Sequence, residues 1–235
     1  FRRAIEHHPN DAEMYYHLGT TLHKQERLQQ AAQAYRQAIE LQSSHAEAHY
    51  NLGLALQEQE QFDQAVQIYQ QAIAFQPNFI DPYNNLGVLL KKQRKFDQAI
   101  QVYLQAIEIA PDNAETHNNL GVIFQELGEL EESVQSYYQA IKINPQFAEA
   151  HKNLGISLLL KGEFDDGWKH YEWRDKCDDF LTENRIFPQP AWNGSNIEGK
   201  SILVWAEQGI GDQIMFASIF EDLLKTKADT IIECE

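Results

Sequence analysis

The chain has 235 residues, with 19 lysines and arginines against 35 aspartates and glutamates, and its formal net charge is −16. Nucleic acids and anionic membranes bind proteins through clusters of Lys and Arg, so this balance argues against both and favours a polypeptide partner. The two cysteines lack metal-ligand spacing, no secretory signal opens the chain, and no apolar run reaches the roughly 20 residues of a membrane span. We expect a protein of the reducing cytoplasm that holds no metal and no cofactor.

A motif recurs every 34 residues over most of the chain. Numbered from Ala12, each repeat has Leu-Gly at positions 7–8 and Tyr at position 24, and most repeats have Ala at position 27. Pro stands at position 32 in three repeats, and Ser43 takes that position in the first. The repeats are 12–45, 46–79, 80–113, 114–147 and 148–181. Residues 1–11 fit positions 24–34 of an earlier repeat, so we expect them to be the remnant of its second helix.

Each repeat is expected to form two helices, at about positions 1–14 (helix A) and 17–30 (helix B), with Pro ending the unit. Gly at position 8 lets the two helices approach closely, and the aromatics at position 24, Tyr171 included, are expected to fill the core. This period and these residues are typical of tetratricopeptide (TPR) helix pairs, which bury their apolar faces only by stacking on one another. The predicted fold is therefore an all-α TPR superhelical solenoid.

The second half of the last repeat departs from the pattern and carries Trp168, Tyr171 and Trp173. These aromatics indicate either a helix that caps the solenoid or a docking surface for the segment that follows.

The C-terminal part has a different composition. Residues 182–200 are rich in Pro and Gly and predict a linker. The apolar run Ser201–Ala206 predicts a buried strand, Gln213–Lys225 a helix, and Thr230–Glu233 a second strand. We therefore expect residues 201–235 to be the truncated start of an α/β Rossmann-like domain.

Positions 2, 6, 9 and 13 of helix A share one face of the helix. In stacked pairs the A helices line the inner surface, so this face predicts a groove for an extended polypeptide. Its residues are Asn51, Asn85, Asn119, Asn153 and His17 at position 6, Leu54, Val88 and Val122 at position 9, and Lys24, Glu58, Lys92 and Glu126 at position 13.

The recurrent Asn at position 6 is a mediocre helix former, which suggests a purpose. It offers a donor and an acceptor together, as an extended peptide backbone requires. The alternative is that it bonds to the neighbouring A helix and fixes the stacking, and one residue could do both. Four such contacts at about 1 kcal/mol each would give only millimolar affinity. The acidic residues at position 2 are expected to complement the helix dipole, and His49, His117 and His151 at position 4 to take part in packing.

The array resembles the TPR arrays of O-linked N-acetylglucosamine transferases, which also have Asn at position 6. The resemblance implies that the row of asparagines holds a substrate polypeptide. The run Gly162–Arg174, the segment Pro190–Gly194 and the turn Glu207–Asp212 are similar to bacterial TPR proteins in which a heptosyltransferase-like glycosyltransferase domain follows the repeats. That likeness implies that Gly209 and Gly211 belong to an acceptor-side loop and that Asp212 is a candidate base. The alternative role of Asp212 is a helix N-cap.

The predicted function is thus a TPR protein–protein interaction module that binds an extended polypeptide. The alternative is the substrate-recognition arm of a glycosyltransferase whose catalytic part lies outside these residues. We expect no glycosyl transfer by the chain as given. Self-association through the cut sheet or the solenoid ends is a further expectation.

Overall fold

The computed structural model of the chain describes residues 9–177, 198, 201–205 and 229–233. These fall into two compact units, residues 1–177 and 178–235. The first contains ten α-helices and one 3-10 helix among its described residues. They are α2 (Ala12–His23), α3 (Leu28–Leu41), α4 (Ala46–Glu58), α5 (Phe62–Phe75), α6 (Ile80–Lys92), α7 (Phe96–Ile109), α8 (Ala114–Leu127), α9 (Leu130–Ile143), α10 (Ala148–Lys161), α11 (Phe164–Tyr171) and η1 (Glu172–Lys176).

The helices alternate as the 34-residue period predicts. The A helices are α2, α4, α6, α8 and α10, and the B helices are α3, α5, α7, α9 and α11. Every B helix begins at repeat position 17, and the first four end at position 30. The prediction of an all-helical solenoid of helix pairs is confirmed for this unit.

Each pair is held together by a glycine that lies under a tyrosine ring. Tyr137 of α9 is fully buried, and a Cβ built on Gly121 of α8 would lie 2.7 Å from its ring. Tyr35, Tyr69 and Tyr103 are equally buried against the glycine of their own pair. Only a residue without a side chain allows the two helices to come this close.

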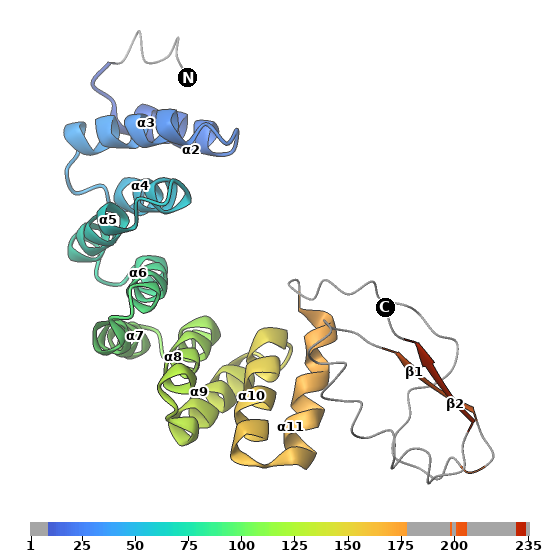
Figure 1. Ribbon diagram of the computed structural model, residues 1–235. Helices are drawn as coiled ribbons and strands as arrows, with labels where there is room; N and C mark the ends of the chain where they lie inside the picture. Colours follow the sequence, from blue (N-terminus) through green and yellow to red (C-terminus); the bar gives the residue numbers. More distant parts are fainter. Residues whose placement is uncertain (1–8, 178–197, 199–200, 206–228, 234–235) are drawn as a thin grey trace. The chain divides into compact units, whose positions relative to one another are not determined.

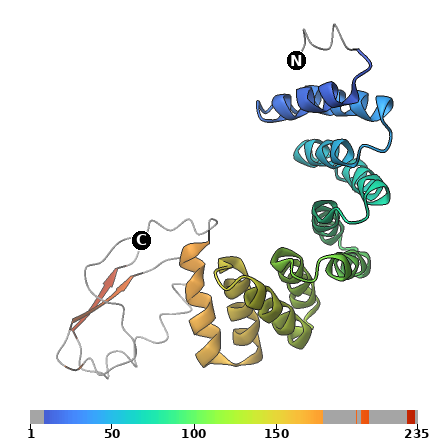
Figure 2. The same ribbon diagram turned by 180° about the vertical axis from the view of Figure 1, so that it is seen from behind.

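Neighbouring pairs are joined mainly where the B helix of one pair packs on the A helix of the next: α3 on α4, α5 on α6, α7 on α8 and α9 on α10. Some successive A helices also meet directly. The helix α2 contacts α4, α6 contacts α8 and α8 contacts α10, whereas no two successive B helices within the described unit pack as closely. The unit therefore bends toward its A helices: in Figure 1, α4 and α6 lie on the inner side of the bend and α5 and α7 on the outer side. Figure 2 shows the same bend from behind.

The side chain at position 4 closes the loop that precedes each A helix. The ring nitrogens Nε2 of His49, His117 and His151 lie 2.9, 2.9 and 3.2 Å from the carbonyl oxygens at position 32. Tyr83 donates its hydroxyl to the corresponding carbonyl of Pro77 at 3.0 Å. These histidines are thus part of the packing, as expected.

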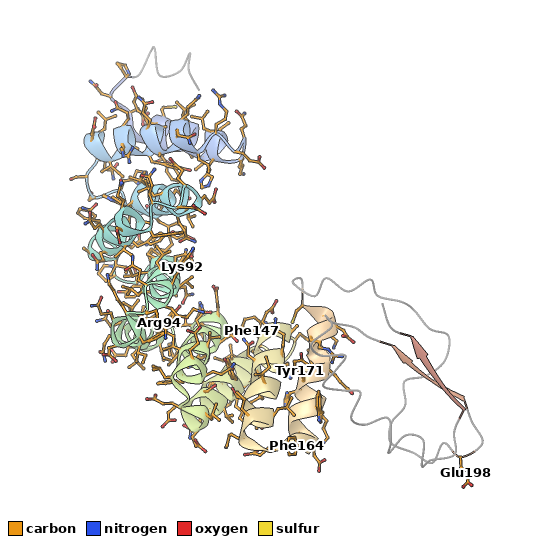
Figure 3. The ribbon with its side chains drawn as sticks, viewed as in Figure 1. Lys92, Arg94, Phe147, Phe164, Tyr171 and Glu198 are labelled. Carbon is orange, nitrogen blue, oxygen red and sulfur yellow. The ribbon has the colours of Figure 1, made fainter. Side chains whose placement is uncertain are left out.

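The last pair differs from the other four. Gly167 replaces the Ala of position 20, and a Cβ on Gly155 would meet the backbone nitrogen of Tyr171 at 2.5 Å. Tyr171, labelled in Figure 3, is only partly buried, so the expectation that it fills the core like the other position-24 tyrosines is wrong. The reason is geometric: Gly155 is covered by the backbone of α11 instead of by the ring.

Beyond Tyr171 the chain continues as η1, whose Trp173 ring stacks on His151 with centroids 3.8 Å apart. The Nζ of Lys176 lies 3.5 Å from the centroid of the Trp173 ring on which it rests. In contrast, Phe164 and Trp168 are 60% and 45% exposed. Of the three aromatics that the sequence singled out in this repeat, Trp173 therefore covers the end of the last pair.

The second unit contains two short strands among its described residues, β1 (Ser201–Trp205) and β2 (Asp229–Glu233). They pair in parallel, with Ser201 opposite Asp229 and Trp205 opposite Glu233. The turn and helix expected between them, and the linker before them, lie outside the described residues. No helix in the described part of the chain combines the length and apolar character needed to cross a membrane.

Candidate functional site: the inner face of the A helices

The asparagines at position 6 lie where consecutive A helices meet. Asn51 donates its Nδ2 to the hydroxyl of Tyr16 at 3.2 Å, and Asn85 donates to Tyr50 at the same distance. Asn153 donates to the Oδ1 of Asn118 at 3.1 Å. Each bond joins position 6 of one repeat to position 5 of the repeat before it. We call this set of contacts the amide seam.

The orientation of Asn51 is fixed by a second bond. Its Nδ2 also donates to the backbone carbonyl of Glu47 at 3.0 Å, and a carbonyl can only accept. The Oδ1 atoms of Asn51, Asn85 and Asn153 accept no hydrogen bond from any described residue, and all three side chains are partly exposed. The amide nitrogen therefore supports the stacking, while the amide oxygen stays available.

Asn119 is the exception in the amide seam. Its neighbour at position 5 is Asn84, whose Oδ1 accepts from the hydroxyl of Thr116 at 2.8 Å. Asn119 consequently makes no side-chain hydrogen bond within the described residues, although it is as accessible as the other asparagines. Its side chain is not needed for the stacking.

A second seam runs along the C-terminal ends of the A helices. The Nε2 of His23 lies 3.0 Å from the Oε1 of Glu58, and the Nζ of Lys91 lies 3.1 Å from the Oε1 of Glu126. These pairs join position 12 of one repeat to position 13 of the next, and we call them the charged seam. Lys92, labelled in Figure 3, places its Nζ 3.8 Å from the centroid of the Phe62 ring.

The remaining residues of the predicted groove have mixed surroundings. Val88 is 37% exposed, whereas Leu54 and Val122 are partly buried and pack against the core. Lys24 and His17 are exposed, and the Nε2 of His17 lies 3.2 Å from the Oε1 of Glu13 in its own helix.

The acidic residues at position 2 lie in the first turn of each A helix, as a helix dipole favours. They also act on one another, because burial and then the nearby Asp81 raise the pKa of Glu115. Burial, followed by Asp81, raises the pKa of Tyr50 as well. The N-terminal ends of the A helices therefore form an acidic edge.

A cavity of about 510 Å³ opens at the acidic edge, between the first two pairs. It is lined mainly by Glu13 and Tyr16 of α2, His45 and Glu47 at the start of α4, and Phe75 at the end of α5. The sequence patterns did not single out this cavity. A signal was present, however: the first repeat, which has Ser43 in place of Pro at position 32, also has His45 at position 34, where the next three repeats have Phe or Asn.

The other predicted site residues, Gly209, Gly211 and Asp212, lie outside the described residues. Within the described part of the chain, no group of three or more His, Cys, Asp or Glu side chains is arranged to hold a metal ion.

Comparison with known protein families agrees with the helix-pair architecture. Models described as TPR repeat or tetratricopeptide repeat match the chain at 1–33, 21–60, 46–79, 68–101, 91–128 and 123–162, and together they span residues 1–162. The chain belongs to the tetratricopeptide repeat family. Such a fold is typical of protein–protein interaction modules.

Individual relatives of this TPR chain are distant. Protein FlbA of Caulobacter vibrioides is 32% identical over 62 residues, which are 26% of this chain and 10% of FlbA. The chain thus spans only about a tenth of that relative.

Solved structures of similar fold include YrrB, MamA and PilF. YrrB, described as a TPR protein with an unusual peptide-binding site, is 24% identical with a TM-score of 0.61, over 74% of this chain and 89% of YrrB. MamA is 20% identical with a TM-score of 0.62, over 69% of this chain and 88% of MamA. PilF of Pseudomonas aeruginosa is 21% identical with a TM-score of 0.64, over 70% and 75%. At these identities the likeness shows the fold alone.

Proposed function

We propose that the inner face of the A helices binds an extended segment of a partner polypeptide. The observation that carries this proposal is that the nitrogen and the oxygen of each asparagine amide have different roles. Their nitrogens bond to the preceding repeat, and their oxygens face no donor of the described chain. A row of such oxygens can accept hydrogen bonds from the backbone N–H groups of an extended peptide, whatever its side chains. The peptide-binding site named in the description of YrrB gives further support.

The affinity expected from this row is modest. Each hydrogen bond contributes about 1 kcal/mol net, so the row alone gives binding in the millimolar range. Side chains of the ligand that contact Val88 or the charged seam would add affinity and selectivity. The partner is therefore expected to be a disordered or extended segment that is held loosely and exchanged readily.

The chain offers variants that separate binding from stacking. The probe is the tightest binder selected from a library of unstructured peptides, titrated by calorimetry. Asn119→Ala removes a free amide and is expected to weaken binding about fivefold while leaving the melting temperature unchanged. Tyr50→Phe removes a stacking bond to Asn85 and should lower the free energy of unfolding by about 1 kcal/mol while keeping the peptide affinity.

The two variants also define failure. If Asn119→Ala bound the probe as tightly as the unmodified chain, the asparagines would serve stacking alone and the proposal would be wrong.

A second candidate function is favoured by one observation in the C-terminal unit. The parallel pairing of β1 and β2 is the arrangement that a β-α-β start of an α/β domain requires. Together with the heptosyltransferase-like motifs up to Asp212, it supports the proposal that the repeats are the substrate-recognition arm of a glycosyltransferase. Reading the gene beyond the codon for Glu235 tests this: a second β-α-β set with a nucleotide-binding loop is expected, and a stop codon soon after would contradict it.

A further inference from the structure

The cavity between the first two pairs has an acidic wall built around a buried imidazole. His45 is 8% exposed. Its Nε2 lies 3.3 Å from the Oε2 of Glu13, and its Nδ1 lies 3.2 Å from the Oε2 of Glu47. The Nε2 has no hydrogen-bond partner with acceptable geometry. The ring is therefore held between two carboxylates that both reach the cavity, and one of its polar atoms is buried there without a proper bond.

The position of the ring follows from the repeat. In the next pair Phe79 occupies position 34 and packs on Tyr50 with centroids 5.0 Å apart. His45 packs on Tyr16 at a similar centroid distance, 4.9 Å. An imidazole thus stands where the next pair has a phenyl ring, and its two nitrogens lie against the two carboxylates of the cavity wall.

The carboxylates remain open to a ligand. The side chains of Glu13 and Glu47 are 56% and 50% exposed. Their ion pairs among the described residues are with His17 and His45, and no lysine or arginine of the described part of the chain lines the cavity. Phe75 also lines the cavity and is 46% exposed. Two carboxylates and accessible aromatic rings are the environment that a cationic side chain prefers.

Arginine suits this wall better than lysine. Its planar guanidinium presents several N–H donors in a fork, so that it can bond to both carboxylates while stacking on a ring. The volume of about 510 Å³ falls within the range of protein pockets that enclose small ligands. We infer that this cavity receives an arginine side chain of the polypeptide bound along the groove. The inference specifies a partner feature and therefore rests on the proposed function.

A small probe tests the cavity independently of the groove. N-acetyl-arginine methylamide is titrated into the labelled chain, and the backbone amide shifts of Ala46 and Glu47 are followed by NMR. The control ligand is N-acetyl-citrulline methylamide, which has nearly the same shape without the charge. Saturable shifts confined to the cavity are expected with the arginine compound at millimolar concentration, and binding by the citrulline compound should be at least about tenfold weaker.

Matched variants then locate the effect. Glu13→Gln combined with Glu47→Gln keeps the size of both side chains and should abolish the preference for arginine. Glu58→Gln is the control, because Glu58 is also half exposed and paired with a histidine, but belongs to the charged seam. It should leave the preference unchanged.

Each outcome decides. Equal shifts with both compounds, no shifts at all, or a preference that survives in the double variant would overturn the cavity assignment. The Asn119→Ala titration would still report on the groove, so that failure of the one proposal is distinguishable from failure of the other.

Discussion

The glycine at position 8 determines how closely the two helices of a pair approach. Gly121 lies under the ring of Tyr137, which is completely buried and donates its hydroxyl to the Oε1 of Gln125 at 3.1 Å. The ring is thus held at both its face and its hydroxyl, and it has little room to move.

Replacing this glycine with alanine is therefore expected to be harmful, although the same change stabilises most helices. The usual gain is about 0.5–1 kcal/mol, whereas overpacking a filled core costs about 1–3 kcal/mol. We predict that Gly121→Ala lowers the free energy of unfolding by about 1–2 kcal/mol, measured by urea denaturation. An increase in stability would mean that the ring can shift aside.

His49 connects the stability of the chain to pH. Its Nε2 bonds to the carbonyl of Ser43, and burial lowers its pKa below the usual 6.5. Because the folded chain holds the neutral ring, the stabilisation is complete above pH 6.5 and is lost as the pH falls from there toward the folded-state pKa.

The next repeat shows how this pH dependence of stability can be removed. Tyr83 makes the equivalent bond to Pro77 with a hydroxyl that does not titrate in this range. We predict that His49→Tyr reduces the fall in melting temperature between pH 8 and pH 5 while leaving the value at pH 8 nearly unchanged. Identical pH profiles for variant and parent would contradict the prediction.

The turns between helices A and B share one special conformation. Position 15 has a positive φ in every repeat: it is Gly128 and Gly162 in the last two, and Glu26, Glu60 and Arg94 in the first three, with φ of 58–59°. A residue with a side chain is strained in this region, and glycine is not.

Glu60 is therefore a site where a loop glycine should help. We predict that Glu60→Gly raises the free energy of unfolding by up to about 1 kcal/mol, because the relief of strain exceeds the added flexibility of the unfolded chain. Glu129→Gly, one position further on in the fourth repeat, is the control and should be destabilising. A loss of stability in Glu60→Gly would show that strain at this turn is negligible.

The elements were more predictable than the contacts. The 34-residue period predicts the helix boundaries, because position 17 starts helix B in all five repeats. It also predicts the close approach of the two helices, because position 8 must be small. The period says nothing about which partner an asparagine selects. Asn119 lacks the bond that Asn85 makes because Asn84 accepts from Thr116 instead. An Asn at position 5 does not by itself remove the bond, since Asn118 accepts from Asn153. The cavity likewise depends on a single substitution at His45 and not on the repeated pattern.

At the scale of the whole molecule, the described repeats form a linear array in which each pair packs mainly against its neighbours. The stability of such an array is approximately a sum of local terms, and damage at one end stays near that end. The Trp173 ring that covers His151 is at the C-terminal end of the described repeats.

We therefore predict that Trp173→Ala speeds amide hydrogen exchange in α10 and α11 by more than about tenfold while changing α4 and α5 little. The comparison of exchange rates along the chain provides the internal control. A uniform increase in all helices would show that the array unfolds as one cooperative body.

Both seams connect a position in one repeat to the position one higher in the next. The sequence separation is therefore always 35, from Tyr16–Asn51 to Lys91–Glu126. Whole 34-residue repeats can consequently be inserted or deleted without changing this pairing. A single residue inserted in an A helix would instead rotate the side chains that follow it in that helix by about 100°. A chain shortened by residues 80–113 would bring Tyr50 next to Asn119, and the asparagine that stands alone today would gain a partner.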